Sequence, residues 1–192
     1  MSGDITNILL VGVGGQGILL ASEILSETFM LAGYDVKKSE IHGMSQRGGS
    51  VVSHVRFGKE IFSPIVPEGE GDILFGFEIL ETYRCLPLLK KGATVIANDL
   101  CIPPPAVLSG KEQYPADLAG KISALFPDFL LVDGLRLATE AGNPRSANTV
   151  LLGAVSMRLD ISEECWLKAL KKMVPPKAFE ENRKAFQAGR NL

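Results

Sequence analysis

The feature that most constrains the fold is a glycine-dense turn near the start of the chain. The turn, residues 12–17, reads GVGGQG and directly follows the short apolar run at residues 5–11. Apolar residues then recur at helical spacing over 18–29, and Gly33 stands where a residue of positive φ closes a helix. With a second strand over 34–38, this order predicts a βαβ unit whose crossover is right-handed.

The rest of the sequence continues the alternation of strands and helices, with one interruption. Residues 50–57 are β-rich, and the turn Gly58-Lys59 separates them from 60–62, which predicts an inserted β-hairpin. The proline-rich segment 101–115 is typical of a loop or lid. The other expected elements are strands over 72–77, 93–97 and 129–132, and helices over 78–90 (shortened or kinked by Pro87 and ended by Gly92), 116–125, 149–157, after Ser162 and from Pro175. The predicted fold class is α/β, a three-layer Rossmann-like and mostly parallel sheet.

Composition limits the class of protein. The chain has 192 residues, of which 46% are hydrophobic and 22% charged, which suits one globular domain over residues 1–192. A net charge of −2 gives no electrostatic reason to expect nucleic acid or an anionic membrane as partner. Three scattered cysteines without a CxxC pair argue against a zinc site, an iron–sulfur cluster or a secreted disulfide framework. With no basic and apolar leader and no apolar run long enough to span a bilayer, the sequence predicts a cytoplasmic protein.

The first glycine turn matches GxGxxG, the pattern that lets a backbone approach a phosphate at a helix N-terminus. Two interpretations remain open. The turn binds a nucleotide or phosphate, in which case Lys37 and Lys38 would suit the 2′-phosphate of NADP. Alternatively, its glycines allow tight packing of strand and helix beneath a surface that another subunit covers. The candidate residues of this turn are Gly12, Gly14, Gly15, Gln16 and Gly17.

A second glycine loop, residues 39–50, carries polar and charged side chains between its glycines. We expect it beside the first turn, beyond the carboxyl ends of the strands, where a guanidinium and free amides would suit a carboxylate or phosphate. The alternative is a purely structural loop, in which Gly48 and Gly49 shape a bend and Arg47 pairs with Glu40. His42 is a candidate acid or base without a visible second member, and no catalytic residue is assigned. The candidate residues of this loop are Glu40, His42, Gly43, Gln46, Arg47, Gly48 and Gly49.

Together the two loops resemble a known family. The runs NILLVGVGGQG (7–17) and EIHGMSQRGGS (40–50) resemble the gamma-type subunit or domain of 2-oxoacid:ferredoxin oxidoreductases. The HGMSQRGG form is most similar to the small (beta) subunit of indolepyruvate ferredoxin oxidoreductase. Ser63-Pro64, the run NTVLLGA (148–154) and the last helix with Asn182, Ala185-Phe186 and Gly189 also fit the family.

The resemblance implies a role in oxidative decarboxylation of a 2-oxoacid, which yields an acyl-CoA, CO₂ and reduced ferredoxin. Family enzymes need thiamine diphosphate with Mg²⁺ and iron–sulfur clusters, whereas this chain has neither a GDG…N pattern nor the cysteines for a cluster. These cofactors are therefore expected in a large partner subunit, with CoA as co-substrate and ferredoxin served by the complex. The resemblance predicts a subunit that shapes the partner's active site and is inactive alone, acting on indolepyruvate or another aryl pyruvate.

Two other functions remain open from the sequence. One is a stand-alone NADP-binding reductase, which the joint occurrence of GxGxxG and Lys37-Lys38 suggests. The other is a non-catalytic scaffold or regulatory module that keeps only the fold. When isolated, a surface built for a partner can pair with itself, so a homodimer of the purified chain is also predicted.

Overall fold

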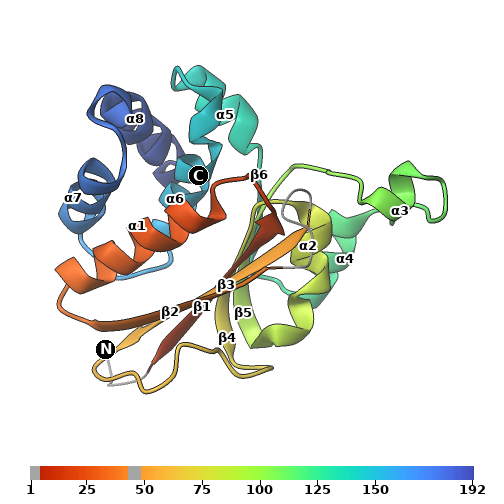
Figure 1. Cartoon of the computed structure of the whole chain (residues 1–192), viewed down its shortest axis with the longest axis horizontal. Coiled ribbons are helices and arrows are strands. Elements are labelled where there is room, and N and C mark those ends of the chain that lie inside the picture. The colour runs from red at the N-terminus through yellow and green to blue at the C-terminus, as the bar shows by residue number, and fades with distance from the viewer. Residues whose placement is uncertain (1–4, 43–48) are drawn as a thin grey trace.

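The centre of the molecule is a six-stranded sheet in the order β2-β3-β1-β4-β5-β6 (Figure 1). The structure, a computed structural model, describes residues 5–42 and 49–192. The strands are β1 (Thr6–Val13), β2 (Asp35–His42), β3 (Ser50–Gly58), β4 (Gly71–Gly76), β5 (Leu89–Asn98) and β6 (Phe129–Val132). Strands β1, β4, β5 and β6 pair in parallel, whereas β3 pairs antiparallel with both β1 and β2. The sheet is therefore mostly parallel, with one antiparallel strand between β1 and β2.

Helices cover both faces of this sheet (Figure 1). One side carries α1 (Ile18–Leu31), α6 (Ala147–Ser156), α7 (Glu163–Met173) and α8 (Phe179–Arg190), with α5 (Gly134–Glu140) packed on α6 and α8. The other side carries α2 (Ile79–Arg84) and α4 (Leu118–Leu125). The short α3 (Pro105–Leu108) projects from the body and buries none of its residues. The described residues also form three 3-10 turns, η1 (Leu86–Leu88), η2 (Pro144–Ser146) and η3 (Pro176–Ala178).

The central strand β1 shows why three layers form. Its side chains alternate between the two faces, and both faces are apolar, as expected for a strand buried on both sides. Ile8 and Leu10 join the core beneath α1 and α6, while Leu9 and Val11 join the core beneath α2 and α4. All four are fully buried. The predicted α/β fold with a three-layer, mostly parallel sheet is confirmed.

Close contact between α6 and α8 fixes the start of α6. A Cβ on Gly189 would lie 1.8 Å from the Val150 carbonyl oxygen, so only glycine permits this approach. The Thr149 hydroxyl donates a 2.7 Å hydrogen bond to Oδ1 of Asn182, which ties the first turn of α6 to α8. Two of the residues that marked the family resemblance, Asn182 and Gly189, thus hold α6 in place.

The expected hairpin is present in a different place. Residues 60–62 are not a strand, and the antiparallel pair is instead β2 with β3, in the register His42↔Val51. The physical reason is that β1 and β2 already flank β3 on both sides, so no edge is left for a further strand. The backbone amide of Ile61 instead donates to the Asp35 carboxylate at 2.8 Å. Strands β1 and β2 do run in the same direction, as the βαβ prediction required, but β3 lies between them.

Two predicted helix ends differ in the structure, and one helix was not predicted. The helix expected over 78–90 is shortened, as Pro87 predicted, but it already ends at Arg84, and Pro87 lies in the separate turn η1 (Leu86–Leu88). Gly92 does not end a helix: it lies inside β5 at φ +78, where the register with β4 shifts. Helix α5 was not predicted, although Asp133 caps it by accepting a 2.9 Å hydrogen bond from the Arg136 amide. Across the described residues, no helix is long and apolar enough to cross a membrane.

Candidate functional site

The candidate site lies at the carboxyl ends of β1 and β4, where the sheet changes its direction of winding. The segment after β1 leads to α1 on one face, and the segment after β4 leads to α2 on the other (Figure 1). Two neighbouring parallel strands whose connections diverge in this way leave a crevice between them, the usual ligand position in open α/β sheets. The first glycine turn forms one side of the crevice, and Phe77 with Glu78 forms the other.

The conformation and packing of the first glycine turn require glycine at several positions. A Cβ on Gly12 would lie 2.6 Å from Oε1 of Gln16 and 2.8 Å from Cβ of Phe77. Gly15 and Gly17 have φ of +100° and +82°, a region that side chains with a Cβ rarely adopt. Gly17 is also the N-cap of α1 and provides no side-chain hydrogen bond there. Among the described residues, the start of this 14-residue helix therefore has no side-chain cap from its N-cap residue, an arrangement that favours an anion.

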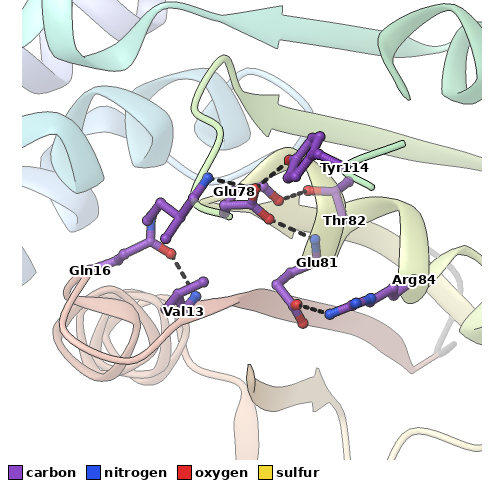
Figure 2. Close-up of polar contacts among 8 residues, drawn as sticks. Val13, Gln16, Glu78, Glu81, Thr82, Arg84 and Tyr114 are labelled. Carbon is purple, nitrogen blue, oxygen red and sulfur yellow. Dashed lines mark hydrogen bonds and ion pairs between the residues drawn. The ribbon is translucent and has the colours of Figure 1, made fainter. Parts of the chain in front are cut away.

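Gln16 holds the two sides of the crevice together (Figure 2). Its Oε1 accepts a 2.6 Å hydrogen bond from the Val13 amide, and its Nε2 donates to the Phe77 carbonyl oxygen at 2.9 Å. Both ends of the side-chain amide are thus used within the protein. Asn98, at the end of β5, adds a second bond to the same carbonyl at 3.3 Å and accepts one from the Gly134 amide at 3.1 Å. These bonds fix the carboxyl ends of β1, β4 and β5 relative to one another.

A cleft of about 530 Å³ opens beside this turn. Asn148, in the first turn of α6, closes one wall, and its Nδ2 lies 2.8 Å from where a Cβ on Gly17 would be. Leu20, Leu135 and Leu151 supply apolar surface. Among the described residues that line the cleft, Arg145 is the one charged side chain. With the uncapped start of α1, Arg145 gives the cleft a positive potential that suits a negatively charged group.

Glu78, which the sequence analysis did not single out, organises the neighbouring surface (Figure 2). The side chain is 1% exposed. Its Oε2 caps α2 by accepting from the Glu81 amide at 2.8 Å. Its Oε1 accepts from the Ile102 amide at 3.1 Å and from the Tyr114 hydroxyl at 2.7 Å. One buried carboxylate therefore anchors both ends of the proline-rich segment 101–115 to the carboxyl end of β4.

The surroundings of Glu78 also change the pKa of the Tyr114 hydroxyl. Burial, together with hydrogen bonds to Cys101 and Glu78 and the negative charge nearby, raises the pKa of the Tyr114 hydroxyl. The hydroxyl therefore remains a proton donor to Glu78 over the physiological pH range. The lid role predicted for 101–115 stays a prediction, but the structure shows where the segment is attached.

Part of the second glycine loop can be placed. The Gly14 amide donates a 3.0 Å hydrogen bond to the Gly49 carbonyl oxygen, so the end of this loop lies beside the first turn, as expected. Glu40 accepts from the Ser22 hydroxyl of α1 at 3.2 Å and lies 3.5 Å from the Lys38 ammonium. Residues 39–42 were predicted to belong to the loop but continue β2, because they pair with β3, and the backbone of His42 ends the strand. Gly43, Gln46, Arg47 and Gly48 lie outside the described residues. A ligand or interface role for either loop remains a prediction.

The position of β2 weakens the NADP interpretation. In a dinucleotide-binding fold the second strand lies next to the first, so that its end faces the ribose beside the glycine turn. Here β3 separates β2 from β1. Lys37 instead pairs with Asp35 at 2.7 Å, and Lys38 lies between the carboxylates of Glu23 and Glu40 at 3.8 and 3.5 Å. Both lysines are thus engaged in ion pairs away from the turn.

The other titratable groups form no second centre in the described part of the chain. There, no three His, Cys, Asp or Glu side chains lie close enough to hold a metal ion. His54 is buried, its Nδ1 accepts from the Val66 amide at 3.1 Å, and burial lowers its pKa. Cys85 is buried, whereas Cys101 is exposed. His54 is therefore a packing residue.

Comparison with known proteins identifies the family. Residues 7–192 match the pyruvate ferredoxin/flavodoxin oxidoreductase family. The chain belongs to this family. Among curated proteins, it is 41% identical to indolepyruvate oxidoreductase subunit IorB of Thermococcus kodakarensis and 42% identical to that of Pyrococcus horikoshii, in each case over 95% of this chain and 93% of the relative. Identity to 2-oxoglutarate synthase subunit KorC of Methanothermobacter thermautotrophicus is 30%, over 96% of this chain and 93% of the relative.

Solved structures of the family share the fold. The gamma subunit of a keto/oxoacid ferredoxin oxidoreductase from Geobacter sulfurreducens matches with a TM-score of 0.70 and 25% identity, covering 97% of this chain and 96% of that one. A 2-oxoglutarate:ferredoxin oxidoreductase from Magnetococcus marinus, solved with 2-oxoglutarate, coenzyme A and succinyl-CoA bound, matches with a TM-score of 0.72 and 20% identity. That match covers 97% of this chain but 30% of the other, so in that enzyme the fold is one part of a longer polypeptide. The family resemblance seen in the two glycine loops is confirmed.

Proposed function

We propose that this chain is the small, non-catalytic subunit of a cytoplasmic 2-oxoacid:ferredoxin oxidoreductase that acts on indolepyruvate or a similar aryl pyruvate. The observation that carries the proposal is the identity of 41% and 42% to two IorB subunits along nearly the whole chain, against 30% to a 2-oxoglutarate synthase subunit. The reaction decarboxylates the oxoacid, transfers the acyl group to CoA and passes two electrons to ferredoxin. Thiamine diphosphate, Mg²⁺ and the iron–sulfur clusters belong to the large partner subunit in this proposal.

The carboxyl edge of the sheet is the surface that we assign to the partner's active site. Both glycine loops meet at this edge, since Gly14 and Gly49 are hydrogen-bonded. The cleft beside them carries Arg145 and the uncapped start of α1, which suit the phosphate groups of CoA. In this role the chain binds and orients, and no bond-making step is assigned to its own residues. Alone, the chain is expected to be inactive.

The test is anaerobic reconstitution with the large subunit. Adding the purified chain should increase the oxoacid-dependent reduction of methyl viologen, with indolepyruvate or phenylpyruvate preferred over pyruvate and 2-oxoglutarate. No stimulation would contradict the subunit role, and a preference for 2-oxoglutarate would contradict the substrate assignment. A saturable titration of the isolated chain with NADPH would instead favour the stand-alone reductase.

The role of the cleft needs a separate variant. Arg145→Glu should raise the KM for CoA roughly tenfold, about 1.4 kcal/mol of binding free energy, with little change in kcat. Lys177→Glu is the matched control, because it reverses the same charge on an exposed residue of η3 outside the cleft. Equal KM values for the two variants would show that the cleft does not receive CoA.

A further inference from the structure

A second cavity, of about 660 Å³, lies at the opposite edge of the sheet. Its walls come from the end of α2, the turn η1, the first residues of β5 and the end of α4. The six residues of β4, which pairs with β5, put the two edges of the sheet roughly 20 Å apart. No described residue lines both this cavity and the cleft at the glycine turn. The function proposed above makes no use of it.

The inner surface of this cavity is apolar. Leu86, Leu89 and Phe126 are buried parts of the core on the α2 and α4 side and form its floor. Leu125, at the end of α4, stands on its wall with 63% of its surface exposed. An apolar group entering the cavity would cover Leu125 and remove its surface from water, which is favourable. The cavity size falls within the range of small-molecule sites, which are mostly apolar with a few charged groups that fix orientation.

The rim of the cavity is positively charged. Its charged lining residues are Arg84, Lys90 and Lys91. Arg84 pairs with Glu81 at 2.7 Å and Lys90 pairs with Asp72, but neither acid lines the cavity. Lys91 is exposed and has no ion pair within the described part of the chain. Because the whole chain has a net charge of −2, this group of three cations is a local feature rather than a general excess of basic residues.

We propose that this cavity binds a small amphipathic carboxylate, with an aryl or acyl body against Leu86, Leu89 and Phe126 and the carboxylate at Lys91. Burial of the apolar body supplies affinity, and the cationic rim selects an anionic head over a neutral or cationic one. The site is a binding site only, since none of its lining residues forms an acid–base or nucleophilic pair.

The isolated full-length chain is sufficient for the first test. We expect 8-anilinonaphthalene-1-sulfonate, an aromatic anion, to bind at one saturable site with a fluorescence increase. Phenylacetate and decanoate should displace it, and phenethylamine, which has an aryl body with a cationic head, should do so at least tenfold less well. Unsaturable fluorescence, or equal displacement by acid and amine, would overturn the proposal.

Variants locate the site. Lys91→Glu and Leu125→Asp should each weaken binding of the sulfonate at least tenfold, and both positions are exposed, so the fold should be unaffected by circular dichroism. Lys111→Glu is the matched control, because this exposed lysine lies outside the cavity. If Lys91→Glu weakens binding no more than Lys111→Glu does, the cavity is not the binding site.

Reconstitution with the large subunit separates a ligand site from a docking surface. Retention of the sulfonate site in the assembled complex would support the proposal. Loss of the site on assembly, together with weaker assembly of Leu125→Asp, would show that the partner covers the cavity and would overturn it. Binding to the isolated chain is measured independently of oxoacid turnover. Absence of sulfonate binding would therefore leave the proposed subunit function intact, and absence of stimulated turnover would leave the proposed binding site intact.

Discussion

The two edges of the central sheet are built in different ways. At the carboxyl edge, the positions of main-chain atoms are fixed by glycines that admit no Cβ and by buried side chains that bond to the backbone, as Gln16 and Glu78 do. At the opposite edge, the cavity is made of apolar side chains and of cations that remain in solvent. The buried and glycine positions at the carboxyl edge therefore also stabilise the fold, whereas the exposed cavity residues Lys91 and Leu125 do not. Substitution of Glu78 or of the turn glycines should destabilise or distort the chain, whereas Lys91→Glu and Leu125→Asp should change binding alone.

The largest effect is expected from Glu78→Ala. The substitution leaves the Glu81 amide, the Ile102 amide and the Tyr114 hydroxyl without their acceptor. Because buried donors left unsatisfied are costly, we expect a loss of about 3–5 kcal/mol in the free energy of unfolding, measured by urea denaturation. Glu112→Ala, at an exposed position on the same proline-rich segment, should change it by less than about 0.5 kcal/mol. Equal losses for the two variants would show that Glu78 does not anchor the segment.

An intermediate effect is expected from Gly17→Ala. Alanine at φ +82 costs about 1–2 kcal/mol, and its Cβ would also meet the Asn148 amide at 2.8 Å. Gly33→Ala provides the control, because Gly33 has a similar φ of +88 and no atom within 4 Å of the added Cβ. The difference in unfolding free energy between the two variants, about 1 kcal/mol, then measures the contact with α6. A difference of zero would mean that Asn148 moves aside freely.

The smallest effect, and one that depends on pH, is expected from Tyr114→Phe. At pH 7 the variant loses one hydrogen bond to a carboxylate, about 1.5 kcal/mol. The folded pKa of Tyr114 is raised above the unfolded value near 10, so the wild-type chain keeps this contribution below pH 10 and loses stability as the pH rises further.

Comparison of the wild-type chain with Tyr114→Phe isolates the contribution of Tyr114 to the pH dependence of stability. Burial also raises the pKa of Cys85 to about 11, but Cys85 is present in both chains and cancels in the difference. The gap in unfolding free energy between wild type and variant should therefore narrow between pH 10 and pH 11. A gap that stays constant would show that the Tyr114 proton is not linked to folding.

Local patterns explain which parts of the molecule could be predicted. The glycine turn, α1 and the closing Gly33 depend on residues within a few positions of one another, and all three were placed correctly. The position of β3 between β1 and β2 could not be predicted, because strand order is decided by pairing between distant segments. The hairpin was therefore assigned to a plausible local turn, Gly58-Lys59, rather than to β2 and β3.

The same reasoning applies to the candidate site. Gly12 and Gly17 could be recognised in the sequence as site residues, because a close approach requires glycine at these positions. Glu78 could not be recognised in the same way, since two of its hydrogen-bond partners are 24 and 36 positions away along the chain. The cavity at the other edge could not be predicted either, because no local sequence pattern marks its leucines and lysines. They form a cavity only where the fold brings α2, β5 and α4 together. Helix α5 could have been found from Asp133, a good N-cap immediately before it.

Helix α2 links the two edges of the sheet directly. Glu78 at its start belongs to the carboxyl edge and Arg84 at its end belongs to the cavity wall, with only six helical residues, about 9 Å, between them. Because the helix is so short, a ligand that displaced the backbone of α2 at Arg84 would also displace its first turn at Glu78. Any coupling between ligands at the two ends would be reciprocal, since each would change the binding free energy of the other by the same amount.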